Sequence, residues 1–185
     1  MTLLLKQLGV GPMANFAYLL CDPSSRECAV VDPGWDAGKI AARAAGCAVT
    51  AVLLTHHHFD HSDGLPALME ESPAPVYIHR EDAALVRSKA GDLREVSDGD
   101  RLKLGRFSVE FLHTPGHTRG SQCLMAGKHL LTGDTLFIGG CGRVDLTDSE
   151  PERMFESLKR RAVLPGPLTV GQGPAYGPAS SALLS

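Results

Sequence analysis

Four of the chain's eight histidines fall within six consecutive residues, in the segment Thr55-His56-His57-His58-Phe59-Asp60-His61. In an extended segment His56 and His58 project to the same side, so their imidazoles can converge on one cation. A turn at Phe59-Asp60 would direct Asp60 and His61 to a neighbouring position. A solvated histidine cluster is the alternative, but the joint pattern favours metal binding at two adjacent sites.

Two further motifs place possible ligands at the ends of predicted strands. In Thr114-Pro115-Gly116-His117-Thr118, the Pro-Gly turn would expose His117, and neutral imidazole is the commonest protein ligand for zinc. In Thr132-Gly133-Asp134-Thr135 a carboxylate follows an apolar strand and a glycine, where it could bridge two cations. Taken singly, Asp134 is more often a turn residue or a helix cap. The other histidines have no such partners: we expect His57 to point away from the metals and His79, His113 and His129 to be structural.

The elements that must position these residues can be read from apolar runs and turn residues. The predicted strands are Thr2–Leu8, Phe16–Cys21, Cys28–Val31, Val49–Leu54, Val76–Ile78, Arg101–Leu104, Phe107–Leu112, Cys123–Met125 and Lys128–Thr132. The predicted helices are Asp36–Ala45, Leu65–Glu71, Glu81–Val86 and Glu150–Arg161. The segment Pro165–Ser185, rich in Pro, Gly, Ala and Ser, is expected to be an extended loop. Many strands with helices between them indicate two packed sheets with helices outside.

Composition limits the class of protein and its partners. The chain has 185 residues, of which 43% are hydrophobic and 21% charged, and a formal net charge of -3. These values predict a single domain over residues 1–185 with no attraction for nucleic acid or anionic lipid. No apolar run approaches the ~20 residues that span a bilayer, so we expect a cytoplasmic protein with a small-molecule partner. Oligomeric state is not predictable. The five cysteines contain no Cys-x-x-Cys pair and are expected to be reduced: Cys21, Cys28, Cys47, Cys123 and Cys141.

Together with Val31-Asp32-Pro33-Gly34, the three ligand motifs occur in the order and rough spacing of the metallo-β-lactamase superfamily. The chain resembles in particular the glyoxalase II-like branch, the hydroxyacylglutathione hydrolases. The resemblance runs from Asn15-Phe16-Ala17-Tyr18-Leu19-Leu20 to Ala175-Tyr176-Gly177-Pro178. It implies an α/β fold, a four-layer αββα sandwich with metals at one edge. By the same resemblance, the ligands of the first metal are His56, His58 and His117, those of the second are Asp60 and His61, and Asp134 bridges the two.

The family pattern breaks at its last ligand. Family members usually carry Pro-Gly-His near the C-terminus, whereas no histidine follows His129 here. Depending on the alignment, Pro174 or Gln172 occupies that position; proline has no ligating side chain, and an amide is a poor ligand for a transition metal. We therefore expect one tightly bound Zn²⁺ and a second site that binds weakly or not at all.

Gly139-Gly140-Cys141-Gly142-Arg143-Val144-Asp145 resembles a segment of persulfide dioxygenases and of some small glyoxalase II-like hydrolases. Arg143 could grip a substrate carboxylate bidentately, with Cys141 near the metals. The alternative is a glycine-rich turn with a surface arginine. Tyr176, in the last segment of the resemblance, is a further candidate for substrate binding.

The favoured function is hydrolysis of a thioester such as a hydroxyacylglutathione. A metal ion would lower the pKa of its bound water towards ~7 and supply hydroxide, and Asp60 would orient it and take up its proton. The runner-up is a persulfide dioxygenase, because His56, His117 and Asp134 form the type of set that holds mononuclear Fe²⁺. A third possibility is a non-catalytic descendant of the fold. The expected partner is a small thiol or thioester, with glutathione derivatives as the candidates.

Overall fold

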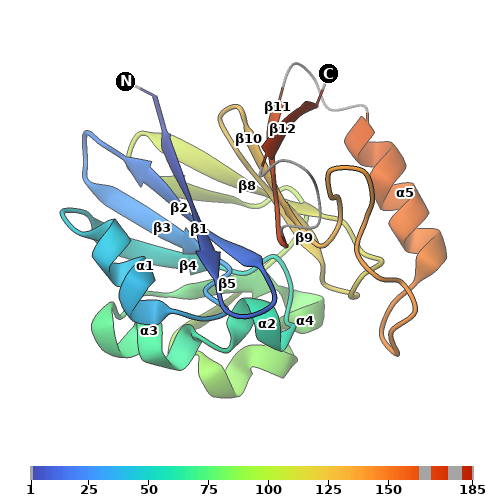
Figure 1. The fold of residues 1–185 in the computed structure, drawn as a ribbon, viewed down its shortest axis with the longest axis horizontal. Helices are drawn as coiled ribbons and strands as arrows, with labels where there is room; N and C mark the ends of the chain where they lie inside the picture. The colour runs from blue at the N-terminus through green and yellow to red at the C-terminus, as the bar shows by residue number, and fades with distance from the viewer. Residues whose placement is uncertain (1, 163–167, 175–180, 185) are drawn as a thin grey trace.

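The computed structural model describes residues 2–162, 168–174 and 181–184, and within them the strands form two six-stranded sheets (Figure 1). In the first sheet the strands follow chain order, the first three antiparallel and the remainder parallel. Its members are β1 (Leu4–Val10), β2 (Asn15–Asp22), β3 (Glu27–Val31), β4 (Ala48–Leu53), β5 (Val76–His79) and β6 (Leu93–Val96).

The second sheet has the order β12-β11-β10-β9-β8-β7. Its strands are β7 (Arg101–Leu104), β8 (Phe107–His113), β9 (Gln122–Ala126), β10 (His129–Gly133), β11 (Leu168–Gln172) and β12 (Ser181–Leu184). All neighbours pair antiparallel except β10 and β11, which are parallel.

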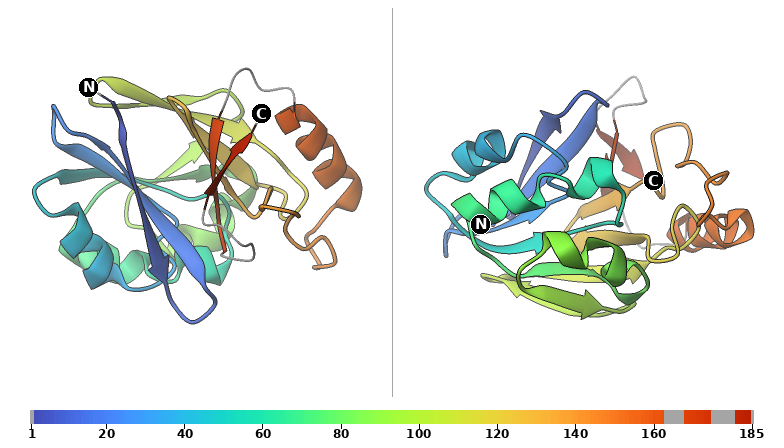
Figure 2. Two further views of the ribbon diagram at one scale, coloured as in Figure 1. Left: turned by 45° about the horizontal axis from the view of Figure 1, so that its top comes forward. Right: turned by 90° about the horizontal axis from the view of Figure 1, so that it is seen from below.

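The helices lie outside the two sheets, on opposite sides of the molecule (Figures 1 and 2). On the side of the first sheet are α1 (Ala37–Ala44), α2 (Phe59–Ser62), α3 (Leu65–Glu71), α4 (Arg80–Val86) and the 3-10 turn η1 (Arg87–Lys89). On the other side α5 (Pro151–Ala162) lies beside the second sheet. The order helices, sheet, sheet, helix is the predicted four-layer sandwich.

Three apolar clusters among the described residues hold these layers together; the smallest gathers Leu112 and Leu130 on the second sheet, and the two larger ones pack the first sheet. One lies between the sheets, where Leu20, Leu53, Phe111 and Leu124 are almost completely buried. The other lies between the first sheet and its helices and joins Ile40 of α1 and Leu68 of α3 to the strands. Burial of a large aliphatic or aromatic side chain contributes about 1.5–3 kcal/mol, so these cores fix the positions of the strand ends.

The predicted ligands follow the carboxyl ends of the strands. His56 comes after β4, His117 after β8 and Asp134 after β10. β3 and β4 run parallel, and β8 and β10 run in one direction because both are antiparallel to β9; the loops of the two sheets meet where the Gln122 N–H donates to the Thr55 carbonyl. Segments far apart in the sequence therefore meet at one edge of the sandwich.

The structure corrects two predictions of local structure. The tail expected to be an extended loop contains β11 and β12, because Leu168–Gln172 pairs in parallel with β10 and forms an interior strand of the sheet. The edge strand β6, with two exposed charged residues in four, escaped prediction. The expected turn at Phe59-Asp60 is the first turn of the short helix α2.

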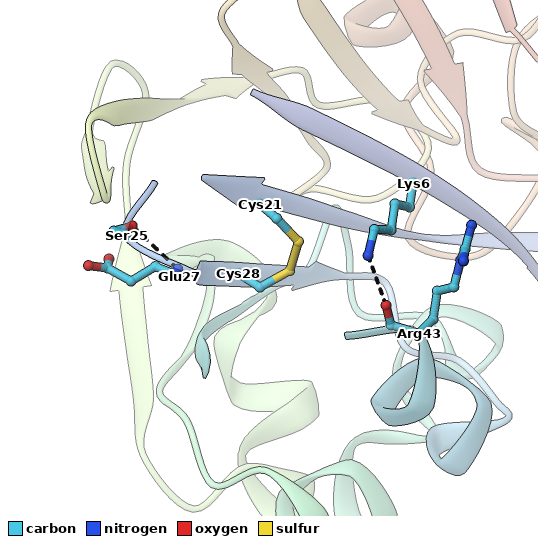
Figure 3. The surroundings of a disulfide bond; sticks show 6 residues. All are labelled: Lys6, Cys21, Ser25, Glu27, Cys28 and Arg43. Carbon is cyan, nitrogen blue, oxygen red and sulfur yellow. Dashed lines mark hydrogen bonds between the residues drawn. A yellow bond between two sulfur atoms is a disulfide. The ribbon is translucent and has the colours of Figure 1, made fainter. Parts of the chain in front are cut away.

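The expectation of fully reduced cysteines is wrong for one pair. Cys21 on β2 and Cys28 on β3 form a disulfide with a Cα–Cα distance of 4.1 Å (Figure 3). The two residues are direct cross-strand partners in an antiparallel hairpin, where opposite Cα atoms approach to about 4.5–5.5 Å, so pairing needs no short sequence motif. Cys47, Cys123 and Cys141 do not take part in a disulfide. No helix among the described residues is long and apolar enough to cross a membrane.

Candidate metal centre

Three imidazoles from two loops converge at the open edge of the sandwich. One ligand atom each from His56, His58 and His117 lies within 4.8 Å of the others. His58 Nδ1 and His117 Nε2 are 3.0 Å apart, and Nε2 of the almost completely buried His56 has no hydrogen-bond partner. Three nitrogens around one point match the open arrangement of catalytic zinc sites.

The outer nitrogens of two rings are held by acceptors, which fixes the tautomers. His117 Nδ1 lies 2.8 Å from the carbonyl oxygen of Arg143, which can only accept, so Nδ1 carries the proton. Thr55 Oγ1 donates its single proton to Asp32 Oδ2 (2.7 Å), so His56 Nδ1 donates to Thr55 Oγ1 (3.1 Å). In both rings the remaining nitrogen, Nε2, presents its lone pair to the cluster, as a metal ligand requires.

Asp60, His61 and Asp134 form a second group beside the first. His61 Nε2 is 3.6 Å from Asp60 Oδ2 and 3.3 Å from Asp134 Oδ1. The other oxygen of Asp134 lies 3.5 Å from His117 Nε2. Asp134 thus faces both groups with one oxygen each, the position of a bridging carboxylate.

Two polar residues that sequence reasoning left without a role complete the second group. Asp32, after β3, accepts the backbone N–H and hydroxyl of Thr55 (both 2.7 Å) and lies 3.0 Å from His61 Nδ1. Asn15, the first residue of β2, donates from Nδ2 to the side chain of Asp60 (3.0 Å) and to its backbone carbonyl (3.1 Å). Both stood in segments that carried the family resemblance, and that was their only signal.

Burial and neighbouring charges shift the pKa values of the clustered residues in different directions. Burial, reinforced by neighbouring imidazoles, lowers the pKa of His58 to about 4 and holds the pKa of His56 well below its usual range. Burial also opposes protonation of His61, but Asp32 and Asp134 outweigh it and raise its pKa. For Asp134, burial favours the neutral form, yet His61 and His117 lower its pKa. In the first group His56 and His58 are thus kept neutral, as metal ligands must be, whereas in the second group the carboxylates favour protonation of His61.

The donor set fits a divalent metal. His56 Nε2 and Asp134 Oδ1 are buried without a hydrogen-bond partner. An unpaired buried polar atom costs about 1–3 kcal/mol, and a cation between these groups would satisfy both. Nitrogen and carboxylate donors together suit zinc or iron.

Among residues 168–174, the part of the tail whose side chains the structure describes, no side chain offers a ligand atom to the second group. Gln172 is fully buried, and its Oε1 accepts the backbone N–H of Ile138 (2.7 Å). The residue facing the group is Gly173: a Cβ built there would lie 2.6 Å from Asp134 Oδ1 and 2.9 Å from His61 Cε1. Pro174 forms an isolated bridge with Asn15.

A buried carboxylate joins the two loops that carry the three histidines. Asp82 Oδ2 accepts the His57 backbone N–H (3.0 Å) and the Thr118 hydroxyl (2.7 Å), and Oδ1 accepts the Gly120 N–H (2.7 Å). His57 Nδ1 also lies 3.0 Å from Asp82 Oδ2, and its ring packs against that of His58 with centroids 4.6 Å apart, so the expectation that His57 points away from the metal cluster does not hold. Asp82 was not predicted, because nothing in the sequence around it marks it.

The loops also pack closely against each other. Gly133 adopts a φ of +48°, and a Cβ there would collide with the Thr55 hydroxyl. A Cβ at Gly34 would overlap the backbone carbonyl of Asp60. Each collision would fall on a residue that carries or orients a ligand.

A cavity of about 610 Å³ opens above the cluster. His58, Asp60, His117 and Asp134 line its floor. Its walls are mainly apolar and also include the predicted substrate residues Cys141 and Arg143; the apolar members are Met13, Phe59, Phe137, Ile138 and Leu146. The exposed Arg143 pairs bidentately with Asp145, at 2.9 and 3.0 Å. Tyr176 lies outside the described residues.

The remaining histidines lie outside the cluster. His79 and His113 stack with ring centroids 3.8 Å apart, and His79 accepts the N–H of Glu81 at the start of α4. Burial, followed by the nearby imidazole of His113, lowers the pKa of His79 to about 4. His129 begins β10, at the opposite end of that strand from Asp134.

Fold and donor set define an αββα protein built to hold metal at one sheet edge. The family model of the metallo-beta-lactamase superfamily matches residues 10–181, and the chain belongs to that superfamily. It is 32% identical over 167 residues to the probable polyketide biosynthesis zinc-dependent hydrolase BaeB of Bacillus velezensis, covering 89% of this chain and 74% of that protein. It is 40% identical over 164 residues to a hydroxyacylglutathione hydrolase of Alkalilimnicola ehrlichii, covering 88% of this chain. The match spans only 62% of the length of that hydrolase.

Solved structures show the same fold. ETHE1 from Myxococcus xanthus superposes with a TM-score of 0.88 at 28% identity, covering 98% of this chain and 80% of that one. TTHA1623 in a di-iron-bound form gives a TM-score of 0.82 at 31% identity, covering 97% and 94%.

Proposed function

We propose that this chain is a metal-dependent hydrolase of thioesters, with a hydroxyacylglutathione as the first substrate to test. The observation that carries the proposal is the meeting of His56, His58 and His117, of which the last two line a cavity together with Asp60. Sequence similarity to a hydroxyacylglutathione hydrolase and to a zinc-dependent hydrolase supports the same reaction class.

The first metal would be held by the three histidines, with Asp134 beside it. A divalent cation there supplies positive charge to the attacked carbonyl oxygen and acidifies a water molecule. Asp60 lines the cavity and its side chain is oriented by Asn15, so it can accept a proton from the attacking water. The thiolate that leaves is a weak base and needs no dedicated protein acid.

The cavity wall would hold the rest of the substrate. The apolar wall formed by Met13, Phe59 and Leu146 suits the acyl or thiol chain. Arg143 would grip a carboxylate by exchanging Asp145 for it; exposed ion pairs contribute only about 0–1 kcal/mol, so the exchange costs little. Cys141 would contact the same substrate from the wall.

A second candidate is a mononuclear Fe²⁺ dioxygenase of persulfides. Its specific support is that Cys141 and Arg143, from the segment resembling persulfide dioxygenases, line the same cavity as His117 and Asp134. The iron would be held by His56, His117 and Asp134. The two candidates differ in the role of Asp60. The hydrolase needs it to accept a proton, whereas it is not one of the proposed iron ligands of the dioxygenase.

The decisive experiment compares metals and substrates on one protein. Anaerobically purified protein is analysed for metal, then loaded with Zn²⁺ or Fe²⁺. We expect the zinc form to cleave S-lactoylglutathione or a related thioester without oxygen. Asp60→Asn should lower kcat by about 10²- to 10⁴-fold, the usual contribution of a proton-transfer group, while one metal per chain is retained.

His129→Gln is the matched control, since it removes a histidine at the far end of β10 and should leave kcat unchanged. If the zinc form is inert toward every thioester tried while the Fe²⁺ form consumes oxygen with glutathione persulfide, the dioxygenase replaces the hydrolase. If the purified protein holds no metal and gains no stability from added metal, both candidates fail.

A further inference from the structure

The wall of the cavity above the proposed metal centre is mostly apolar. Of the described residues that line it, five have apolar side chains that take no part in the metal centre: Met13, Phe59, Phe137, Ile138 and Leu146. Met13 is 40% exposed and Phe59 is 54% exposed, although both side chains are large and apolar. Large apolar side chains that stay exposed together at a cavity indicate a surface that binds an apolar group.

Met13 and Phe59 share one support, the ring of Trp35. Phe59, the first residue of α2, meets Trp35 edge to face, with ring centroids 6.2 Å apart. Gly11, in the turn that carries Met13, lies against the same ring, because a Cβ built there would collide with it. Trp35 in turn packs against the core between the first sheet and its helices. The fold therefore holds this apolar surface in place before a substrate arrives.

The contacts of the wall residues distinguish two ends of the cavity. Phe59 directly precedes Asp60, which belongs to the second group of ligands, and Met13 shares the support of Phe59. The backbone carbonyl of Arg143 lies 2.8 Å from Nδ1 of His117, which belongs to the first group. A thioester carbonyl above the metal centre would therefore have the surface of Met13 and Phe59 on one side and Arg143 on the other.

We propose that the surface of Met13 and Phe59 receives the acyl group, and that the preferred substrates are thioesters with an apolar acyl chain longer than a lactoyl group. The inference rests on the proposed hydrolase and names its substrate class. Of the described residues that line the cavity, Arg143 is the sole cation, and the acids are Asp60 and Asp134 at the floor. A carboxylate of the thiol half therefore belongs at Arg143, which leaves the apolar end for the acyl half.

The loop after β10 adds a second apolar surface to the same cavity. Phe137 and Ile138 stand in a tight turn, in which the Phe137 N–H donates to the Gly140 carbonyl at 2.8 Å. The Ile138 N–H donates to Oε1 of the fully buried Gln172 at 2.7 Å. Gln172, one of the two candidates for the last ligand position, thus holds a residue of the cavity wall.

These surfaces suit a hydrocarbon chain better than a hydroxyacyl group. The hydroxyl of a lactoyl group finds no hydrogen-bond partner among the apolar side chains, and removing it from water without a partner is unfavourable. A methylene group that leaves water for an apolar surface strengthens binding by about fourfold when it is fully buried. The cavity of about 610 Å³ lies within the range of about 300–1,000 Å³ that holds small molecules, so it has room for such a chain.

The test varies the acyl group while the thiol half stays the same. Zinc-loaded protein is assayed with lactoyl, acetyl, butanoyl and hexanoyl thioesters of glutathione, and then with lactoyl thioesters of ethanethiol and hexanethiol. The variants are Met13→Ser, Phe59→Ser and the conservative Phe59→Leu. Leu85→Ser and Phe155→Ser are matched controls, because these side chains are 57% and 62% exposed on α4 and α5 and do not line the cavity.

We expect kcat/KM to rise by about 2- to 4-fold for each methylene between acetyl and hexanoyl, so that hexanoyl exceeds lactoyl by more than about tenfold. The rise should come mainly from a lower KM, because the chain makes the same contacts in the ground state and in the transition state. Met13→Ser and Phe59→Ser should each lower the ratio of hexanoyl to acetyl turnover by about 3- to 10-fold. Phe59→Leu and both controls should keep that ratio close to the wild-type value.

Three results would overturn the inference. The first is a kcat/KM that does not rise with the length of the acyl chain. The second is a rise that both Met13→Ser and Phe59→Ser leave intact. The third is a rise with the length of the thiol chain instead, which would assign the apolar surface to the thiol half. In each case cleavage of the shorter thioesters leaves the proposed function standing, whereas a zinc form that cleaves no thioester removes that function and this inference together.

Discussion

The two halves of the metal centre lie within a few ångströms of each other but are prepared differently. In the first half His56 Nε2 has no partner, and the outer nitrogens of His56 and His117 are held by fixed acceptors. In the second half Asp60 is already paired with Asn15, and His61 lies between Asp32 and Asp134. Each half keeps one buried atom without a hydrogen-bond partner, His56 Nε2 in the first and Asp134 Oδ1 in the second, but only in the second are the remaining members held by contacts among acidic and amide side chains. Ligand identity alone does not determine affinity, because the neighbours decide whether a donor is free.

The largest effect should come from the first half. His58→Ala or His117→Ala should abolish thioester turnover and remove the stabilisation that zinc provides. At 1,000 times Kd that stabilisation is about 4 kcal/mol, or about 8–16 °C in Tm for a chain of this size. Scanning calorimetry with and without chelator measures it.

His129→Gln should keep the full zinc-dependent rise. If His61→Ala loses as much of the zinc-dependent rise in Tm as His117→Ala does, the two halves of the metal centre do not differ in their affinity for zinc.

A smaller effect should follow from weakening the hydrogen bonds by which Asp82 joins the two loops that carry the three histidines. Asp82→Asn keeps the shape but loses acceptor strength toward His57, Thr118 and Gly120, so the histidines become less well oriented. Zinc affinity of the first site should fall by about 10- to 100-fold with the ligands intact. Calorimetric titration would detect it, and an unchanged affinity would show that the loops hold their positions without this carboxylate.

The smallest effect should be a pH dependence of stability that comes from His79, which stacks on His113 and is not a proposed metal ligand. The pKa of His79 is lowered to about 4, against about 6.5 for an unfolded chain. Between these values the unfolded state binds more protons, so stability falls as pH drops from about 6.5 to about 4. His79→Gln should flatten this decline in urea unfolding of the chelated protein at pH 7, 6 and 5.

Adding zinc to the same experiment separates the contribution of His79 from that of the ligand histidines. It should protect the ligand histidines against acid over this range but leave the contribution of His79 unchanged. A decline equally steep in His79→Gln and the wild type would place the sensitivity elsewhere.

Much of the candidate site could be predicted because its proposed ligands are concentrated in short motifs after apolar strands. The structure brings His56, His58, Asp60, His61, His117 and Asp134 together as the strand ends require. The fold was equally accessible, since four ordered motifs identify the architecture.

What escaped prediction depends on contacts between distant segments. Asn15 and Asp60 are 45 positions apart, and Asp82 and Thr118 are 36 apart. Asn15 and Asp82 are single polar residues, and their contacts form only when the strands pair and the loops pack. The same holds for Cys21 and Cys28, which meet through the register of a hairpin, and for β11, which is a strand because β10 offers it an edge.

The close packing of Gly34 against Asp60 and of Gly133 against Thr55 also limits how this protein can change. A side chain at either glycine would displace a backbone or hydroxyl that orients the ligands, so laboratory libraries should find few functional variants there. Met13, Phe59 and Leu146 line the cavity without holding a ligand. New substrate preferences should therefore be selected from that wall, while the loops beneath it are inherited almost unaltered.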